Sequence, residues 1–504
     1  MTRRHGTLAL RMTFRIPRHG PGAWAAGRVF LLLVLAACGE SPRSPGNAPT
    51  SARYDADGKP EDPAVRATRR PSILLICLDT VRADAFAPWS DEPLFAECSA
   101  WFAARGTAFR QAVSAAPWTA PAVASLLTGL LPSRHGARDL APDLTVVPSV
   151  TTLAELLGVQ GWRRAAFAGG GWVSTHNGML QGFEHSLESF SFGAATPHLL
   201  SGFPALGKDP WFVFAHTFEA HDPYLAPPAE PGRGRPPPPP VDLAAVDREA
   251  AEDGGRSLTR RFLLDASTRS VVFENALGGP RIRTVTRYFE RGFRADPQGP
   301  ALAAEARAAY DEGLRRLDRA VATFLREVEA RGLLKEAVVF LVSDHGEAFG
   351  EHGTLHHGRM LHDVLVHVPL LVAGEGFAKG AIVDEPCSLL DVLPTVCELA
   401  GLPTPEGIDG RSLLPLARGG RGRPVIAEER RTEAETGFPG DETLVAVRDA
   451  RWTWIRTTDR ATGSSSEEIF DRASDPGETS SVGRDRAELS DEFRTAQRAA
   501  RTTR

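Results

Sequence analysis

The sequence predicts an α/β protein with a doubly wound, mostly parallel sheet, followed by a smaller C-terminal α+β subdomain. Apolar runs recur without polar alternation, helical patterns lie between them, and polar residues follow several runs directly. Four runs are predicted as buried parallel strands and a fifth as a further strand, at 73–78, 165–168, 211–215, 337–342 and 368–372. The clearest helical pattern covers 310–331, with apolar residues on one face and Gly332 as its stop.

Length and composition limit the class of protein. The chain has 504 residues, 42% of them hydrophobic and 24% charged, with a net charge of −5. This composition excludes a disordered, collagen-like or disulfide-stapled protein, and the length suits one large domain with a smaller one. The slightly acidic balance gives no support for a nucleic-acid partner. Only four lysines are present, so an active site has few lysines to draw on.

The N-terminus is typical of an exported protein. An arginine-rich stretch without acidic residues precedes the apolar run 29–37, so we interpret 1–37 as a signal peptide. Leu35-Ala36-Ala37-Cys38 resembles the cleavage motif of bacterial lipoproteins, which implies lipidation of Cys38 and a membrane anchor. The alternative is an ordinary signal peptide with an incidental cysteine. Residues 38–71 are rich in Pro, Ser and Ala and are predicted to be a flexible tether on the periplasmic or cell-envelope side.

Two composition changes divide the rest of the chain. The proline-rich stretch 227–240 opens an insertion that is expected to reach about residue 301, within a catalytic domain covering 72–405. From 406 to 482 the pattern changes to short strands, of which 444–448 and 452–455 are the clearest. Residues 483–504 are arginine-rich and are predicted to be a frayed tail.

Polar residues at three predicted strand ends suggest a metal site. Asp79 follows the first strand, His216 follows the run at 211–215, and Asp344 and His345 follow the run at 337–342. In doubly wound sheets the carboxyl ends of the strands form the functional site. Two carboxylates and an imidazole suit one divalent ion such as Zn²⁺ or Mn²⁺ better than Ca²⁺. Taken singly, Asp79 could be a helix cap and Asp344-His345 part of a polar turn.

A threonine marks the mouth of a predicted helix. Pro121 fits the first turn of a helix, which places Thr119 where free N–H groups favour an anion. The alternative is that Thr119 only caps that helix.

Together these segments resemble the sulfatase family of the alkaline phosphatase superfamily, over about residues 72–477. No single motif carries the resemblance, but the combination is specific. The matching segments are 78–84 (LDTVRAD), 119–129 (TAPAVASLLTG), 132–136 (PSRHG), 216–224 (HTFEAHDPY), 343–347 (SDHGE), 351–353 (EHG), 357–358 (HG), 367–370 (HVPL), 390–395 (LDVLPT) and 410–414 (GRSLL).

The resemblance implies a role for each matching residue. Asp79, Asp344 and His345 would be metal ligands, and Thr119 would take the nucleophile's place and also contact the metal. The resemblance implies that His221 and His357 bind the transferred oxyanion or protonate the leaving group. For His221 the alternative is a turn histidine, and for His357 the neighbouring histidines 352 and 356 compete for the same position.

The chain departs from the sulfatase pattern at the nucleophile. The family has Cys or Ser in Cys/Ser-x-Pro-x-Arg, which is converted to formylglycine, whereas this chain has Thr119 and, in place of the arginine, Val123. Thr80 replaces the second acid of an Asp-Asp pair, and His345 stands where calcium-binding sulfatases have Asn. No lysine falls in a motif, and we expect no separate ligand pair for a second metal. These changes point away from formylglycine chemistry with calcium, and the site instead resembles that of superfamily members that use threonine directly on phosphoryl groups.

Three functions follow as hypotheses. The first is an exported, lipid-anchored hydrolase of sulfate or phosphate esters, acting on a small-molecule, glycan or lipid ester with Thr119 as nucleophile. The second is a transferase of the same chemistry that modifies envelope lipids or glycans. The third is a binding protein that kept the fold and lost turnover.

Overall fold

The computed structural model describes most of the chain beyond the predicted tether. The described residues are 70–138, 145–175, 177–188, 192–206, 209–224, 299–431, 441–482 and 487–502. The predicted signal peptide, Cys38, the tether up to residue 69 and nearly all of the predicted insertion lie outside them. Within the described part, no helix combines the length and the apolar character needed to span a bilayer.

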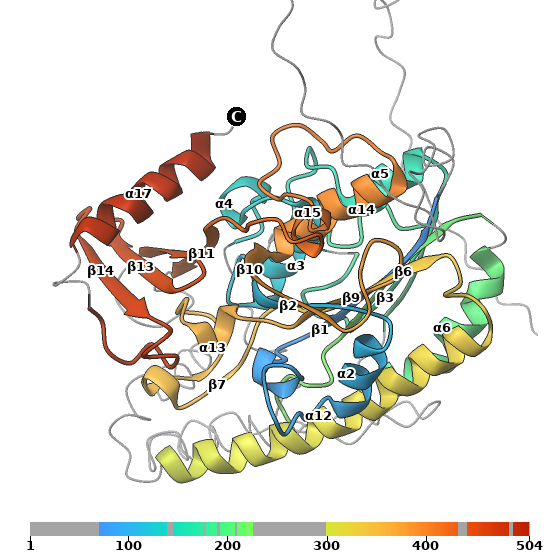
Figure 1. The fold of residues 1–504 in the computed structure, drawn as a ribbon, viewed down its shortest axis with the longest axis horizontal. Helices are drawn as coiled ribbons and strands as arrows, with labels where there is room; N and C mark the ends of the chain where they lie inside the picture. The colour runs from blue at the N-terminus through green and yellow to red at the C-terminus, as the bar shows by residue number, and fades with distance from the viewer. Residues whose placement is uncertain are drawn as a thin grey trace, which may run out of the picture. The chain divides into compact units, whose positions relative to one another are not determined.

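An eight-stranded sheet forms the centre of the fold (Figure 1). The strand order is β10-β2-β9-β6-β1-β5-β3-β4. Four neighbouring strands confirm the four apolar runs and pair in parallel: β1 (Ser72–Leu78), β3 (Arg163–Ala168), β5 (Trp211–Thr217) and β6 (Ala337–Ser343). Three strands were not predicted: β2 (Gly106–Val113), β4 (His185–Glu188) and β10 (Ala381–Ser388).

The fifth predicted strand is displaced and reversed. β9 covers Leu370–Ala373 rather than 368–372, and it runs antiparallel to both β6 and β2. A parallel pair needs a crossover connection, usually a helix, that returns the chain to the opposite edge of the sheet. The chain between β6 and β9 forms only short elements, so it re-enters the sheet from the edge at which β6 ended. These elements are β7 (Ala348–Phe349), a 3-10 turn (Glu351–Gly353), β8 (Leu355–His356) and α13 (Asp363–Val366).

Helices cover both faces of the sheet, as a doubly wound domain requires. One face packs under α2 (Ala96–Ala103), α6 (Phe192–Gly202) and the long α12 (Gly299–Ala330). The other packs under α3 (Thr119–Thr128), α5 (Leu153–Val159) and α14 (Val392–Ala400). Alternate residues of β1 enter the two cores, since Leu74 and Ile76 belong to one and Ile73 and Leu75 to the other. Shorter helical segments are Ala83–Ala85, α4 (Pro132–His135), Phe203–Leu206, Leu389–Asp391 and α15 (Leu414–Ala417).

The long helix begins earlier than its sequence pattern indicated. α12 starts at Gly299, so it includes residues 299–301, which were assigned to the insertion. Residues 299–309 are rich in alanine, and small buried side chains give a weak periodic signal. Ala303, Ala306 and Ala309 nevertheless face the core.

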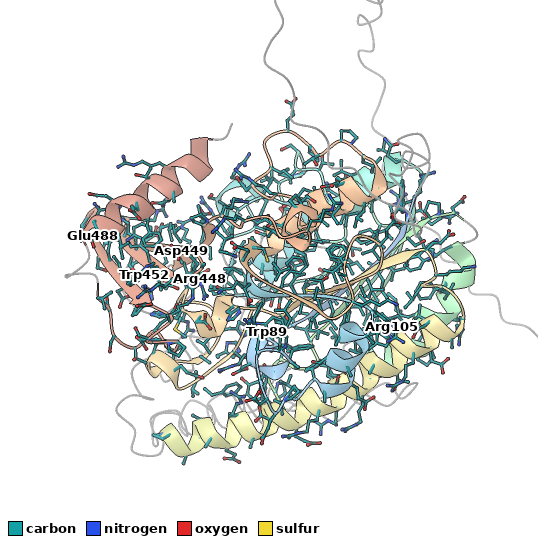
Figure 2. All side chains as sticks on the ribbon, viewed as in Figure 1. Trp89, Arg105, Arg448, Asp449, Trp452 and Glu488 are labelled. Atoms are coloured by element: carbon teal, nitrogen blue, oxygen red, sulfur yellow. The ribbon has the colours of Figure 1, made fainter. Side chains whose placement is uncertain are left out.

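A second sheet follows at the C-terminus. Its four strands are antiparallel and sequential: β11 (Val425–Arg431), β12 (Glu442–Arg448), β13 (Trp452–Asp459) and β14 (Ser465–Asp471). Figure 2 labels Arg448, Asp449 and Trp452 in this part of the molecule.

The predicted frayed tail is wrong, because its residues form helix α17 (Ala487–Thr502). Phe493 is buried against the C-terminal sheet, with its ring stacked 6.4 Å from that of Trp454. Leu489 and Ala496 pack on the same cluster, at helical spacing from Phe493. A single short apolar stripe among many arginines and acids was too weak a signal to find in the sequence.

Candidate active site

Three neighbouring strands end at the same edge of the central sheet and bring their following residues together. Leu78 of β1 pairs with Thr217 of β5 and with Ser343 of β6. The ladder continues one residue further, since the Asp79 amide donates to the Thr217 carbonyl (3.1 Å) and the Asp344 amide to the Leu78 carbonyl (3.2 Å). The two aspartates therefore leave the sheet side by side, as the sequence predicted.

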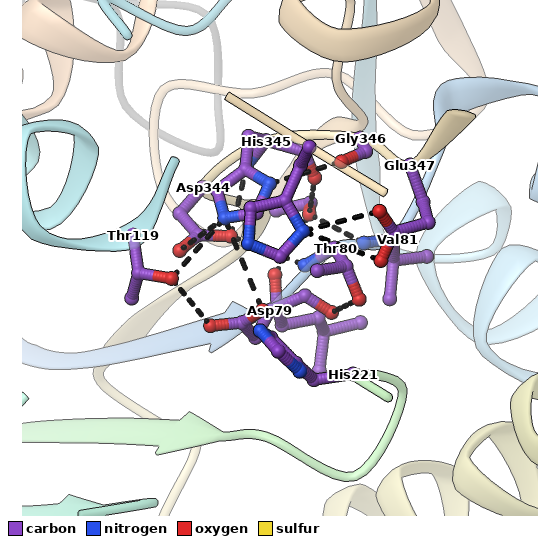
Figure 3. A network of polar contacts seen from close by, with 12 residues as sticks. Asp79, Thr80, Val81, Thr119, His221, Asp344, His345, Gly346 and Glu347 are labelled. Atoms are coloured by element: carbon purple, nitrogen blue, oxygen red, sulfur yellow. Dashed lines mark hydrogen bonds and ion pairs between the residues drawn. The ribbon is translucent and has the colours of Figure 1, made fainter. Parts of the chain in front are cut away.

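Asp79, Asp344 and His345 form a buried cluster with the composition of a metal site (Figure 3). One ligand atom from each lies within 4.8 Å of the others, and all three side chains are fully buried. Asp79 Oδ1 and Asp344 Oδ2 have no hydrogen-bond partner among the described residues. Buried carboxylate oxygens without partners are costly, so the donor set fits a bound cation.

The backbone orients the ligands of this cluster. Asp344 Oδ1 accepts from the His345 amide (2.8 Å), which turns its other oxygen toward the cluster. His345 Nδ1 lies 2.9 Å from the Gly346 carbonyl. Because a carbonyl only accepts, Nδ1 carries the hydrogen and Nε2 keeps a lone pair for a metal.

The electrostatics of the cluster agree with a cation site. Burial and the charge of Asp79 raise the pKa of Asp344 well above its ordinary value. Burial also acts to raise the pKa of Asp79, but His216, His221 and His345 outweigh it and lower that pKa. Burial lowers the pKa of His345 to about 4, so its imidazole is neutral at pH 7, which is the form that binds metals.

Thr119 lies against this cluster at the start of α3. Its Oγ1 is 3.1 Å from Asp79 Oδ2 and 3.2 Å from His345 Nε2. Trp118, with extended backbone, occupies the N-cap position, so Thr119 is the first helical residue rather than the cap. Figure 3 shows the Thr119 side chain directed at Asp79 and His345. The free N–H groups of the first helical turn add a positive potential at this point.

The predicted histidines His221 and His357 adjoin the same cluster. The ring of His357 lies 4.4 Å from that of His345 and 4.8 Å from that of His221. His221 belongs to the turn that follows β5, and His357 follows β8. Of the two competing histidines, His356 also joins this group, whereas His352 stacks on His362 with ring centroids 3.8 Å apart.

Sequence reasoning placed His216 at the end of a strand without assigning it a role, and it missed two carboxylates of the site. His216, the sixth residue of β5, is fully buried with Nε2 3.6 Å from Asp79 Oδ2. Asp222 and Glu347 are buried carboxylates that contact the histidines. Asp222 and Glu347 lie inside the motif segments, but only three-dimensional contact distinguishes them from ordinary turn residues.

The departures from the sulfatase pattern have structural counterparts. Val123 of α3 is fully buried in the apolar core that this helix covers. Lys335 and Lys379, the two lysines in the described ranges, precede β6 and β10. These strands run in the same direction, so both lysines lie at the edge of the sheet opposite the site.

A buried hydroxyl at a helix N-terminus, beside carboxylates and imidazoles, is an arrangement that can supply a nucleophile and stabilise an anion. The chain belongs to the sulfatase family, whose model, described as "Sulfatase", matches residues 71–402. A second model, "N-sulphoglucosamine sulphohydrolase, C-terminal", matches 350–498 and includes most of α17.

Individual relatives cover different shares of the chain. Human arylsulfatase K is 32% identical over 159 residues, which cover 30% of this chain and 28% of that protein. The chain spans about a third of the length of the choline-sulfatase of Rhizobium meliloti, with which it is 32% identical over 181 residues. A delta 4,5-hexuronate-2-O-sulfatase of Bacteroides thetaiotaomicron is 24% identical over 454 residues, covering 84% of this chain and 86% of that one.

Solved structures share the fold at low sequence identity. The phosphonate monoester hydrolase of Agrobacterium radiobacter superposes with a TM-score of 0.60 at 20% identity, over 86% of this chain and 95% of that one. A protein solved with its substrate D-glucosamine-2-N,6-O-disulfate gives a TM-score of 0.62 at 17% identity, over 86% and 98%. The α/β fold predicted from the sequence is confirmed.

Proposed function

We propose that this protein is a metal-dependent hydrolase of phosphate or sulfate esters in which Thr119 Oγ1 is the nucleophile, in place of formylglycine. The observation that carries the proposal is the position of this hydroxyl. It is buried at the N-terminus of α3, within 3.2 Å of both a carboxylate and an imidazole of the cation cluster.

Each group of the site has a separate role in the proposed reaction. Thr119 Oγ1, which donates a hydrogen bond to Asp79 Oδ2 3.1 Å away, attacks the phosphorus or sulfur atom. The bond from that atom to the ester oxygen breaks, and the alcohol leaves. A divalent ion held by Asp79, Asp344, His345 and Thr119 would supply Lewis acidity there, and the imidazole ligand favours Zn²⁺ or Mn²⁺ over Ca²⁺. The N–H groups of α3 stabilise the negative charge of the transferred group. Water then hydrolyses the Thr119 ester.

His221 and His357 line the same site and complete it. Burial lowers the pKa of His357 well below its ordinary value, so this ring is neutral at pH 7. A neutral imidazole donates a hydrogen bond to an oxyanion more readily than it gives up a proton, which favours an oxyanion-binding role for His357. His221 lies in the same surroundings. It either binds the oxyanion or protonates the leaving group.

The substrate class follows from the relatives and from the nucleophile. The relatives include sulfatases, and the fold neighbours include a phosphonate monoester hydrolase and a protein that binds a disulfated glucosamine. Together these support a small-molecule or glycan ester as substrate. A threonine that needs no conversion to formylglycine favours phosphoryl over sulfuryl transfer.

Substitution of two threonines on one helix tests the nucleophile. Thr119 and Thr128 are both buried on α3, but the Thr128 hydroxyl only donates to the Ala124 carbonyl. The chelator-treated full chain is assayed with aryl phosphate mono- and diesters and an aryl sulfate, with added Zn²⁺, Mn²⁺ or Ca²⁺. We expect Thr119→Ala to lose about 10³-fold or more in kcat, since nucleophile removal has effects of at least this size. Thr128→Ala should stay active.

Two results would contradict the proposal. Full activity of Thr119→Ala excludes this residue as nucleophile. Full turnover by the chelator-treated chain without added metal excludes the metal-dependent reaction.

We also propose export and lipid anchoring at Cys38, which lies outside the described residues. The apolar run 29–37 before Cys38 supports this. The intact mass of protein isolated from a bacterial membrane fraction should correspond to a chain that begins at Cys38 and carries acyl groups. Cys38→Ala should not carry them. An unacylated wild-type mass would exclude the anchor.

A further inference from the structure

We propose that Tyr310 is a positioning residue for the cation cluster of the proposed function, on which this role depends, and that it acts through the backbone of Thr80. Thr80 follows Asp79 directly and lies in the left-handed region, with a φ of 59°. Threonine carries a branched Cβ that disfavours this region, and such a conformation persists only where surrounding contacts hold it. Thr80 therefore needs a partner that keeps it left-handed.

Thr80 contacts both aspartates of the cluster. Its amide donates to Asp344 Oδ1 (3.3 Å; Figure 3). The same oxygen accepts from the His345 amide (2.8 Å), which leaves Asp344 Oδ2 for the cation. The Thr80 hydroxyl donates to the Asp79 carbonyl (2.8 Å). The position of Thr80 therefore helps to orient one ligand and fixes the chain just after the other.

The chain is anchored on both sides of Thr80. Before it, the Asp79 amide extends the ladder between β1 and β5, and after it the Val81 amide donates to Ser343 Oγ (2.9 Å). A change in the φ of Thr80 must therefore be absorbed by the neighbouring peptide units. One of these units carries the N–H that binds Asp344, so the left-handed conformation and the orientation of Asp344 are linked.

Tyr310 of α12 holds this segment of the chain with one hydroxyl. The hydroxyl donates to the Thr80 carbonyl (2.8 Å) and accepts from the Arg82 amide (3.2 Å). The residue is 1% exposed, and its ring lies 5.8 Å from that of Tyr224 and 5.0 Å from that of Phe349. Burial raises the pKa of Tyr310 well above its ordinary value, so the hydroxyl keeps its hydrogen. A fixed, neutral donor therefore holds the carbonyl of the left-handed residue.

The alternative is that this hydroxyl only satisfies two backbone groups and stabilises the fold. Thr395 of α14 provides a matched control. Its Oγ1 also donates to one backbone carbonyl, that of Asp391 (2.6 Å), and accepts from one amide, that of Leu413 (2.8 Å). None of these three residues belongs to the cation cluster. Tyr310→Phe and Thr395→Val each remove one hydroxyl and nearly keep the shape of the side chain.

Zinc affinity and thermal stability of the full chain separate the two roles. The chelator-stripped protein is titrated with Zn²⁺ against a chromophoric chelator, and the binding that Asp344→Ala abolishes is assigned to the cluster. We expect Tyr310→Phe to raise the dissociation constant of this ion about 10- to 100-fold, the usual cost of removing a group that orients metal ligands. Thr395→Val should leave it unchanged. Both substitutions should lower the unfolding temperature of the metal-free chain, since each removes two hydrogen bonds.

A second substitution tests whether Tyr310 acts through Thr80. Glycine adopts a left-handed φ without the penalty of a Cβ, so Thr80→Gly should keep the conformation without an outside partner. In the Thr80→Gly background, Tyr310→Phe should change the dissociation constant of Zn²⁺ by less than about 3-fold. Should Tyr310→Phe alone fail to fold, Thr80→Gly in the same chain should restore both folding and zinc binding.

Each contrary result has a distinct meaning. Wild-type zinc affinity in Tyr310→Phe, together with a lowered unfolding temperature, overturns the positioning role and leaves the metal site intact. An equal loss of affinity in both backgrounds, or a double variant that stays unfolded, overturns the action through Thr80. A wild type that binds no zinc overturns the metal site and the positioning role together, whereas full activity of Thr119→Ala removes only the proposed nucleophile.

Discussion

At the scale of single residues, His135 supports the helix that carries Thr119. It is fully buried in α4 and contacts α3, the helix that carries Thr119. His135 Nδ1 accepts from the Ala137 amide (3.2 Å), so Nε2 carries the hydrogen and lies 3.0 Å from Ser125 Oγ. Burial lowers the pKa of His135 to about 3. The residue therefore stabilises the fold only as a neutral ring.

This depressed pKa predicts acid sensitivity. Below pH 6.5 the unfolded chain binds a proton at this histidine and the folded chain does not, down to about pH 3. The free energy of unfolding therefore decreases as the pH is lowered across this range, by up to about 1.4 kcal/mol per pH unit for this residue. Chemical denaturation between pH 6 and pH 4 should show a shallower pH dependence for His135→Gln than for the wild type.

A matched substitution separates this effect from general acid instability. His185 is an exposed histidine at the start of β4, and His185→Gln should keep the wild-type slope. Parallel pH profiles for the wild type and His135→Gln would show that His135 does not carry the acid sensitivity.

At the scale of elements, the sequence predicted what depends on local pattern. β1, β3, β5 and β6 are continuous apolar runs, and each was found from its own residues. β2 and β10 contain polar residues such as Arg110 and Asp384, which face out near the edge of the sheet and hide the apolar signal. The direction of β9 depends on the path of the chain after β6, and no periodicity records that path.

The same division holds for the site. Asp79, Thr119, Asp344 and His345 follow strands or begin a helix, so their positions along the chain were sufficient to group them. The grouping of His356 with His221, and of Glu347 with His357, depends on how two loops fold against each other. Sequence alone gave three candidate histidines near 352–357, and only packing separates His352 from the other two.

At the scale of the whole molecule, the C-terminal sheet contacts two loops of the site: the segment that precedes Thr119 and the segment that follows His357. The Glu428 amide of β11 donates to the Ala115 carbonyl (2.8 Å), and Glu429 accepts from the Trp118 indole (3.1 Å) just before Thr119. On the other side, Arg431 donates to the carbonyl of Arg359 (2.9 Å), two residues after His357. The small sheet therefore contacts both the segment that precedes Thr119 and the segment that follows His357, and we expect the two sheets to unfold together.

Arg448 is the charged residue that connects the C-terminal sheet to α13. It lies on β12 with 3% of its side chain exposed. It pairs with Asp363 of α13, a helix that follows His357 in the chain. Glu478, also buried, accepts from the Asp363 amide (2.7 Å). Burial acts to raise the pKa of Asp363, but His367 and Arg448 outweigh it and hold that pKa well below its ordinary value. Removal of the guanidinium would leave two carboxylates facing each other at the junction.

We therefore expect Arg448→Met to lower the free energy of unfolding by about 3 kcal/mol, because breaking a buried pair from one side leaves an uncompensated charge. The control is Arg451→Met, three residues further on, whose side chain is 57% exposed and paired with Asp471. A surface pair of this kind contributes less than about 1 kcal/mol.

The measurement is urea denaturation followed by tryptophan fluorescence and by residual esterase activity. Because β11 holds both loops of the site, the two signals should be lost in a single coincident transition in all three proteins. Activity lost at a lower urea concentration than the fluorescence change, or equal effects of the two substitutions, would show that the C-terminal sheet does not brace the site.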